Sequence, residues 1–386
     1  MSSVNLGLTS SFPRSEALVS ATRDLDRGRR GAEEVQALFE QETSRVIALE
    51  TKFGFSTVSG GDLQRQDLFR PFSDSTPGLE VGPLTRWFET NTFFRQPIVN
   101  APPQWAPGAF ARQLPLERLL ETHLPPRVIL PGPYTFVMLA DNRTDLTQAE
   151  LGRRWSEVLA LEVHDLAAHG VRAVQIQEPS LVVRPPSVDE EEWVRGIYDP
   201  LASALSEVDS LLWTFFGDGA PILPLLASLP VDTVGVDLAD TDPALLTDLP
   251  PGKGLGLGCL DSRTTLLEDP QEIARIVREV NSRLQPSEIL LGPGAPLELV
   301  PWGVAERKLG VLPQVRDLLE GAPAGARSAG GQAEASASDT GGKSSAPSGR
   351  ARGNARTRGE GSSSDRSRPR STKPRPSRSK ARGGSR

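Results

Sequence analysis

The sequence is poor in the residues that form cross-links and soft metal sites. Its 386 residues include one cysteine, Cys259, and three histidines. A single cysteine excludes any disulfide within the chain, which is typical of proteins from a reducing cytoplasm. His164 and His169 are five residues apart and do not share a helix face, so they are poorly spaced for a metal pair. We expect Cys259 to be a small, buried apolar residue.

Long apolar runs are missing as well. No stretch approaches 18 consecutive apolar residues, so we expect no membrane-spanning helix. The first residues lack the basic-then-apolar pattern of a secretory signal peptide. Together with the low cysteine content, these features predict a cytoplasmic protein.

Lysine is scarce in the first 322 residues, where only Lys52, Lys253 and Lys308 occur and arginine supplies the other positive charges. This bias indicates either a GC-rich genome or adaptation to high salt, where surface carboxylates keep a protein soluble. Residues 1–322 carry 28 Lys and Arg against 45 Asp and Glu, whereas residues 323–386 carry 15 against 4. The net charge of −6 therefore hides an acidic body and a basic tail.

The tail, residues 323–386, is rich in Gly, Ser, Pro and Arg and has no apolar periodicity. Such a segment cannot bury enough surface to offset its ordering entropy, so we predict that it is disordered. Its arginines could bind nucleic acid electrostatically. However, it has no aromatic residue to stack on bases, and we favour a solvated extension over a nucleic-acid-binding segment.

The acidic body alternates two kinds of apolar segment. Helices are expected over 32–53, 150–169, 198–208, 221–229, 243–248 and 270–284. Strands are expected over 55–59, 127–130, 171–176, 210–216, 233–237, 254–259 and 288–291. Strands that alternate with helices predict a parallel sheet, and about eight such units fit an α/β fold of the (β/α)8 TIM-barrel type. A doubly wound open sheet is the alternative, but no glycine-rich dinucleotide fingerprint follows a first strand.

Polar residues gather at the predicted strand ends. In a β/α barrel the ligand lies at the carboxyl ends of the strands. The residues at these positions are Gly61-Asp62, Gln177-Glu178, Phe216-Gly217-Asp218, Asp237 and Cys259. Their convergence predicts a ligand site at one end of the barrel.

Several short motifs follow one another in a fixed order. They are SFPR at 11–14, GGDLQRQD at 60–67, TRWFETN at 85–91, VQIQEP at 174–179 and LWTFF at 212–216, followed by LPV at 229–231 and VDL at 236–238. Over about residues 5–310, the chain resembles the cobalamin-independent methionine synthase family, whose members look like two related barrels in one chain. The segments 85–91, 212–216 and 229–238 are closer to the N-terminal barrel than to the catalytic C-terminal barrel, and 85–91 is the most specific of them.

The resemblance implies methyl transfer from 5-methyltetrahydrofolate to homocysteine, in which the catalytic barrel binds zinc through a His-x-Cys pair, a Glu and a second Cys. Zinc lowers the pKa of the homocysteine thiol, and the thiolate takes the methyl group. The matching positions here are Thr214 or Phe215, Asp237 and Ala295, while the catalytic His corresponds to Asp261. Asp237 alone matches a ligand, and one carboxylate cannot hold zinc. We therefore predict no metal, no cofactor and no catalytic residue in this chain, and expect zinc in a partner barrel.

The resemblance also implies substrate contacts. Arg86 looks like the basic residue that binds the folate polyglutamate tail, and Arg14 lies in the other matching basic segment. A guanidinium suits this task because it pairs with carboxylates through two bonds. The predicted substrate-binding set is Arg14, Asp62, Arg86, Asn91, Gln177 and Glu178, with Gln177 in place of the Asp that grips the homocysteine amine. The alternatives are a surface ion pair for Arg86, a turn cap for Asp62 and a structural hydrogen-bond acceptor for Glu178.

Three functions fit these observations. The first is a separately encoded N-terminal-type barrel of a split methionine synthase, which works with a zinc-bearing barrel on another chain. The second is a metal-free methyltransferase with another donor or acceptor, in the neighbourhood of uroporphyrinogen-decarboxylase-like barrels. The third is a folate- or amino-acid-binding module without chemistry.

Overall fold

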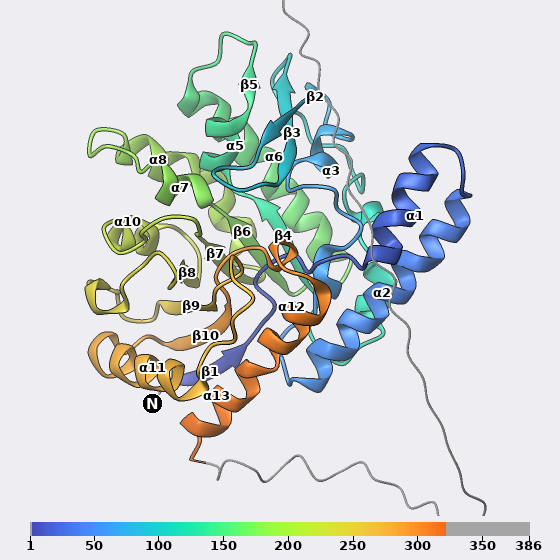
Figure 1. Cartoon of the computed structure of the whole chain (residues 1–386). Coiled ribbons are helices and arrows are strands. Elements are labelled where there is room, and N and C mark those ends of the chain that lie inside the picture. The colour runs from blue at the N-terminus through green and yellow to red at the C-terminus, as the bar shows by residue number, and fades with distance from the viewer. Residues whose placement is uncertain (1, 322–386) are drawn as a thin grey trace, which may run out of the picture. The chain divides into compact units, whose positions relative to one another are not determined.

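The computed structural model describes residues 2–321 of the chain (Figure 1). The predictions made for the tail, 323–386, lie outside the described residues. Within 2–321, no helix is long and apolar enough to cross a membrane.

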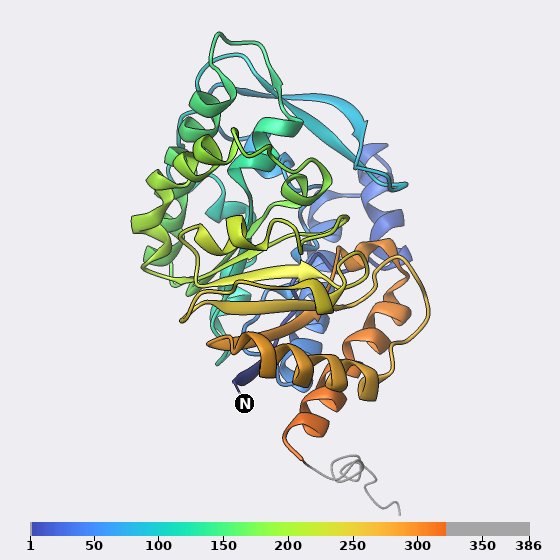
Figure 2. The ribbon, with the colours of Figure 1, turned by 90° about the vertical axis from the view of Figure 1, so that its left-hand side faces the viewer.

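Seven parallel strands form the central sheet. They are β1 (Ser3–Leu6), β4 (Arg127–Pro131), β6 (Ala173–Gln177), β7 (Asp209–Trp213), β8 (Thr233–Asp237), β9 (Gly254–Leu260) and β10 (Glu288–Pro293). They pair in the order β1-β10-β9-β8-β7-β6-β4 (Figure 2). All of them except β1 were expected from the sequence.

The segment 55–58 closes this sheet into a barrel. The amide of Ser56 donates to the carbonyl of Leu6 at 2.9 Å on one side. On the other side, the amide of Val58 donates to Pro125 O at 3.0 Å, and Arg127 N donates to Val58 O at 2.8 Å. The predicted strand at 55–59 is thus present as a short bridging segment. Eight parallel segments complete the predicted (β/α)8 barrel.

Helices cover the outside of the barrel. The longer ones are α1 (Glu16–Asp26), α2 (Ala32–Lys52), α6 (Gln148–Ala168), α11 (Pro270–Leu284), α12 (Trp302–Leu309) and α13 (Val311–Leu319). The shorter ones are α3 (Arg70–Ser73), α4 (Leu116–Leu120), α5 (Pro133–Leu139), α7 (Pro179–Val183), α8 (Glu191–Ile197), α9 (Ala202–Leu205) and α10 (Leu223–Ser228). The predicted α6 begins at a capping box between Thr147 and Glu150, and Gly170 follows its end with φ of 94°.

Three predicted elements are shorter than expected. Pro200 splits the helix expected over 198–208 into a 3-10 turn (Asp199–Leu201) and α9. The helix expected over 243–248 is a single 3-10 turn (Pro243–Leu245), because the chain is already extended at Leu246. The strand expected over 210–216 ends at Trp213, and Phe216 has a left-handed φ of 71°.

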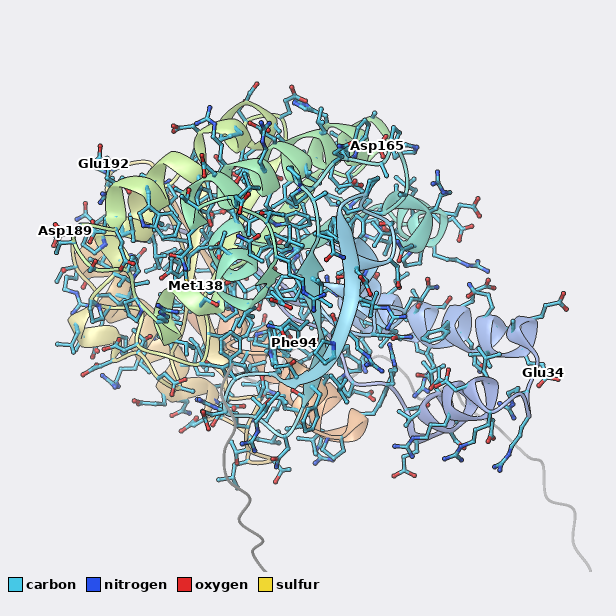
Figure 3. The ribbon with its side chains drawn as sticks, turned by 90° about the horizontal axis from the view of Figure 1, so that it is seen from above. Glu34, Phe94, Met138, Asp165, Asp189 and Glu192 are labelled. Carbon is cyan, nitrogen blue, oxygen red and sulfur yellow. The ribbon has the colours of Figure 1, made fainter. Side chains whose placement is uncertain are left out.

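A small second sheet was not expected from the sequence. It consists of β2 (Leu79–Arg86), β3 (Phe93–Val99) and the two-residue β5 (Asp141–Asn142), and β2 and β3 form an antiparallel hairpin. The motif 85–91 therefore spans the end of β2 and the turn of this hairpin. Seen from above, Phe94 on β3 lies over the middle of the molecule, whereas Glu34 lies on the projecting pair α1–α2 (Figure 3).

Trp213 fills the barrel interior and explains the glycines of β8 and β9. Its side chain is fully buried, and its indole NH donates to Gly294 O at 2.8 Å. A Cβ atom added to Gly235 or Gly256 would come within 2.0 or 2.3 Å of the indole ring. These two positions need glycine because any side chain would collide with the ring.

Candidate functional site at the barrel mouth

A cavity of about 40 Å³ lies at the carboxyl end of the barrel strands, under the β2–β3 hairpin. We call it the mouth cavity. Its lining comes from the segment after β1 (Ser11), the 65–68 loop (Arg65, Gln66, Asp67, Leu68), the hairpin (Trp87, Thr92, Phe93, Phe94), β6 (Gln177) and the segment after β10 (Pro296, Glu298). This volume suits a few water molecules and is smaller than an amino acid.

Gln177 presents to the mouth cavity a polar side chain that has no partner among the described residues. It is the last residue of β6 and is only 3% exposed. Its side chain lines the cavity, and among residues 2–321 no hydrogen-bond partner is found for its amide. Because buried polar groups are nearly always paired, this amide is available to a ligand or to water.

Asp62 and Arg65 form a buried ion pair beside the cavity. The glycines Gly60 and Gly61 have positive φ, and so has Asp62, at 54°. Asp62 Oδ2 lies 3.1 Å from an Arg65 terminal nitrogen, and the two side chains are 9% and 10% exposed. Burial raises the pKa of Asp62, while Arg65 opposes this shift. Arg65 also donates to Ile129 O at 3.0 Å, so Asp62 holds Arg65 against the barrel wall.

Glu178 points away from the cavity and into the fold. Its carboxylate accepts hydrogen bonds from Tyr134 N at 2.9 Å, Thr135 N at 2.7 Å and the Tyr198 hydroxyl at 2.6 Å. It thus caps the first turn of α5. Complete burial raises the pKa of Glu178 to about 7. This geometry matches the alternative role of Glu178, a structural hydrogen-bond acceptor. Contact between Glu178 and a substrate stays a prediction.

Arg14 donates hydrogen bonds to the loop beside the site. Its Nε donates to Leu63 O at 2.7 Å and a terminal nitrogen donates to Arg65 O at 2.9 Å. The guanidinium lies over the Phe39 ring, 5.5 Å from its centroid. Arg14 does not line the mouth cavity, and its proposed folate contact stays a prediction.

The structure brings Arg86 and Asn91 together in the exposed hairpin turn. Arg86 Nε donates to Thr90 O at 2.7 Å, and a terminal nitrogen donates to Asn91 Oδ1 at 3.2 Å. Neither residue lines the mouth cavity, although Trp87 and Thr92 beside them do. The predicted residues therefore form two groups, one in the hairpin turn and one at the barrel strands.

Two aromatic residues connect the hairpin to the barrel, Phe88 in the motif 85–91 and Phe216 at the end of the predicted strand 210–216. Phe88 has φ of 48° and Phe216 has φ of 71°, and their ring centroids are 5.9 Å apart. Bulky residues rarely adopt positive φ, and such strain gathers at functional sites. The sequence pairs Trp-Phe at 87–88 and Phe-Phe at 215–216 are the only local sign of these residues. Their contact depends on the β2–β3 hairpin, which was not predicted.

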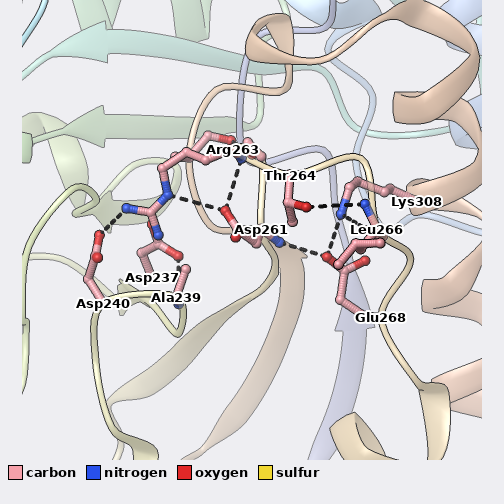
Figure 4. Close-up of polar contacts among 11 residues, drawn as sticks. Asp237, Ala239, Asp240, Asp261, Arg263, Thr264, Leu266, Glu268 and Lys308 are labelled. Carbon is pink, nitrogen blue, oxygen red and sulfur yellow. Dashed lines mark hydrogen bonds and ion pairs between the residues drawn. The ribbon is translucent and has the colours of Figure 1, made fainter. Parts of the chain in front are cut away.

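The positions expected for zinc ligands do not fit a metal ion; Asp237 and Asp261, which matches the catalytic His, are drawn in Figure 4. Thr214 donates its hydroxyl to Gly235 O at 3.0 Å, and Ala295 is buried. Asp237 accepts from Ala239 N at 3.0 Å, while Asp261 is 3.2 Å from Arg263. Across residues 2–321, no group of three or more His, Cys, Asp or Glu could hold a metal ion.

Cys259 does not help to build a metal site. It is buried on β9, as expected, and burial raises the pKa of its thiol to about 12. The thiolate that a metal would need is therefore disfavoured. His164 instead lies 3.0 Å from Glu207 on the exposed surface.

Comparison with known proteins assigns the family. Residues 74–285, more than half of the chain, match the model of the cobalamin-independent synthase N-terminal domain. The chain is 32% identical over 215 residues to a 5-methyltetrahydropteroyltriglutamate–homocysteine methyltransferase of Mycobacterium tuberculosis. The match covers 52% of this chain but only 27% of that relative, so the chain spans about a quarter of its length. A methionine synthase of Sulfurisphaera tokodaii is 22% identical over 302 residues, which cover 78% of this chain and 87% of that protein.

Solved structures share the fold. A B12-independent methionine synthase from Shewanella sp. W3-18-1, in complex with selenomethionine, superposes with a TM-score of 0.68 at 17% identity, covering 83% of this chain and 97% of that one. A methyltransferase from Methanosarcina mazei has a TM-score of 0.56 at 15% identity, covering 82% and 95%. These likenesses confirm the barrel. The chain therefore belongs to the cobalamin-independent synthase family, where it matches the N-terminal domain.

Proposed function

We propose that this chain is the N-terminal-type barrel of a split methionine synthase. It works in methionine biosynthesis with a separate, zinc-bearing catalytic barrel. The pair transfers a methyl group from 5-methyltetrahydrofolate, carried as a polyglutamate, to homocysteine. The observation that carries this proposal is the poor fit of Thr214, Asp237 and Ala295 to zinc, because the chemistry then needs ligands from another chain.

The hairpin turn supports a role in folate binding. Arg86 is exposed and keeps one terminal nitrogen without a partner among the described residues. Asn91 holds the guanidinium in place from the other side of the turn. A polyglutamate tail is a chain of carboxylates, and a fixed, exposed guanidinium binds carboxylates well.

The mouth cavity supports a second candidate, a binding module without chemistry. Gln177 offers a buried amide without a protein partner, and Ser11 and Arg65 lie around the same cavity. Such a module would bind folate or an amino acid without a partner chain and without turnover. A metal-free methyltransferase would instead convert its substrate alone.

Reconstitution tests the proposal. The chain, a zinc-bearing C-terminal-type barrel from the same cell, and their mixture are assayed for methionine formation from homocysteine and 5-methyltetrahydrofolate triglutamate. We expect product only from the mixture, together with binding of the two chains at micromolar concentration. If the zinc-bearing barrel were fully active alone and did not bind this chain, the proposal would fail. Turnover by this chain alone would favour the metal-free methyltransferase.

A further inference from the structure

A cluster of opposite charges occupies the barrel end at β8 and β9. We call it the β8–β9 charge cluster. It contains four carboxylates and two cations, namely Asp237, Asp240, Asp261, Glu268, Arg263 and Lys308 (Figure 4). Asp237 ends β8, and Asp261 directly follows β9. The cluster thus stands where a ligand of the barrel would be held.

Arg263 lies between two of these carboxylates. A terminal nitrogen of its guanidinium is 2.7 Å from Asp240 Oδ2, and its Nε is 3.2 Å from Asp261 Oδ1. Its backbone amide donates to the same Asp261 oxygen at 2.9 Å. The Arg263 side chain is 35% exposed, so solvent screens these ion pairs only in part.

Asp237 places a third carboxylate under the same guanidinium. It is 1% exposed, and its Oδ2 atom is buried with no partner among the described residues. Burial raises the pKa of Asp237 to about 7, while the amide of Ala239 and the positive charge of Arg263 oppose this shift. A buried carboxylate without a nearby cation would be costly, so Arg263 matters to Asp237 although they share no hydrogen bond.

Lys308 fixes the other end of the same loop. Its side chain is fully buried, and its Nζ is 2.5 Å from both Glu268 Oε1 and Leu266 O. Glu268 Oε1 also accepts the amide of Asp261 at 2.9 Å. The loop 261–268 is therefore held by one cation at each end.

We propose that Arg263 is a resident cation that pairs with Asp240 and Asp261 in place of a metal ion, and that it leaves this barrel end without affinity for zinc. The inference rests on the contacts of Arg263 alone. It does not depend on the proposed split enzyme, because a binding module or a metal-free enzyme could carry the same cluster.

The variant R263Q tests the charge, and R275Q is its matched control. Arg275 also contacts two carboxylates, Glu272 at 2.6 Å and Glu279 at 2.5 Å, but on the exposed face of α11. We expect R263Q to lower the melting temperature of the full chain by roughly 2–5 °C, because the variant leaves repelling carboxylates together. R275Q should change it little, because exposed ion pairs contribute little. In 1 M NaCl the deficit of R263Q should shrink, since salt screens the repulsion.

Rescue separates charge from packing. R263K keeps the positive charge and should recover most of the lost stability, and the double variant D240N/R263Q should lose less than the two single variants together. If R263Q were as stable as R275Q, or if R263K were as unstable as R263Q, the proposal would be wrong. If R263Q does not fold, the melting temperatures of R263K and D240N, each compared with that of the wild type, test the charge of Arg263 instead.

Zinc titration completes the test. We expect the purified wild-type chain to take up no stoichiometric zinc and its melting temperature to stay unchanged when zinc is added. Uptake of one zinc per wild-type chain that D240N and D261N abolish would mean that a metal displaces Arg263. That result would overturn the proposal.

Discussion

Two regions at the same end of the barrel differ in whether their polar side chains are paired within the protein. At β6, the buried amide of Gln177 faces the mouth cavity and has no partner among the described residues. At β8 and β9, Asp240 and Asp261 are paired with Arg263, and Glu268 is paired with Lys308. The first region leaves a polar side chain facing a cavity, and the second pairs its charges within the chain. Strand-end positions of one barrel can therefore differ in whether their polar side chains are paired within the protein.

Removal of Lys308 should have the largest effect on stability, because Lys308 is one of the two cations of the β8–β9 charge cluster. K308M would leave Glu268 without its cation, while Lys308 itself is fully buried. We expect a loss of about 3–5 kcal/mol in the free energy of unfolding, measured by urea denaturation. K52M is the matched control, because Lys52 is exposed at the end of α2, and it should change little. A loss below about 1 kcal/mol in K308M would show that the β8–β9 charge cluster does not depend on this pair.

Substitution of Glu178 should have the next largest effect. E178Q keeps the shape but places an amide NH2 among the donors Tyr134 N, Thr135 N and Tyr198 OH, which should cost about 1–3 kcal/mol. E192Q on the exposed surface is the control and should change stability little. If E178Q were as stable as the wild type but lost ligand binding, Glu178 would be a substrate contact after all.

The contribution of Glu178 to folding stability should depend on pH. The pKa of Glu178 is about 7 in the fold, above its ordinary value, because burial disfavours the charged form. The folded state therefore binds this proton more tightly than the unfolded state, and the contribution of Glu178 to stability falls as pH rises from about 4.5 through 7. We expect the penalty of E178Q to be larger at pH 5 than at pH 8 in denaturation experiments. An equal penalty at both values would contradict the raised pKa.

Removal of the Gln177 amide tests whether the mouth cavity binds a ligand. Q177A should change the free energy of unfolding by less than about 1 kcal/mol, because no protein hydrogen bond is lost. It should weaken binding of an amino-acid or folate ligand about tenfold, measured by calorimetry. Q175A is the contrast, because the Gln175 amide donates to Thr9 O at 2.7 Å inside the barrel. Unchanged ligand binding in Q177A would mean that the cavity is not the site.

The smallest effect is expected in the hairpin turn. R86Q should reduce the preference for triglutamate over monoglutamate folate about fivefold, because one guanidinium–carboxylate contact is lost. R95Q on β3 is the control within the same exposed hairpin and should leave the preference unchanged. If both variants behaved alike, the contact would be a general effect of charge.

The barrel could be predicted from the sequence because its signals are local. The strands at β4, β6, β8 and β9 are short apolar runs between turn residues, and α6 has a capping box at Thr147. The hairpin was missed because Gly82 and Pro83 interrupt β2, and the register of the two strands shifts between Val81 and Leu84. A bulged strand of this kind lacks the regular alternation on which the prediction depends.

The site could be predicted only in part. Gln177 ends β6 and Asp62 follows the segment 55–58, so their place at the barrel end follows from the topology. The orientation of Glu178 into α5 could not be predicted, because it depends on Gly132: a Cβ there would lie 2.1 Å from the Glu178 carboxyl carbon. The pairing of Arg263 with Asp240 joins two loops that are 23 residues apart, and nothing local indicates it.

The zinc content of the purified chain, alone and after co-purification with a zinc-bearing C-terminal-type barrel from the same cell, shows which barrel holds the metal. We predict no stoichiometric zinc in the isolated chain and one zinc per complex. One zinc in each isolated chain would contradict the account, because this barrel would then hold its own metal.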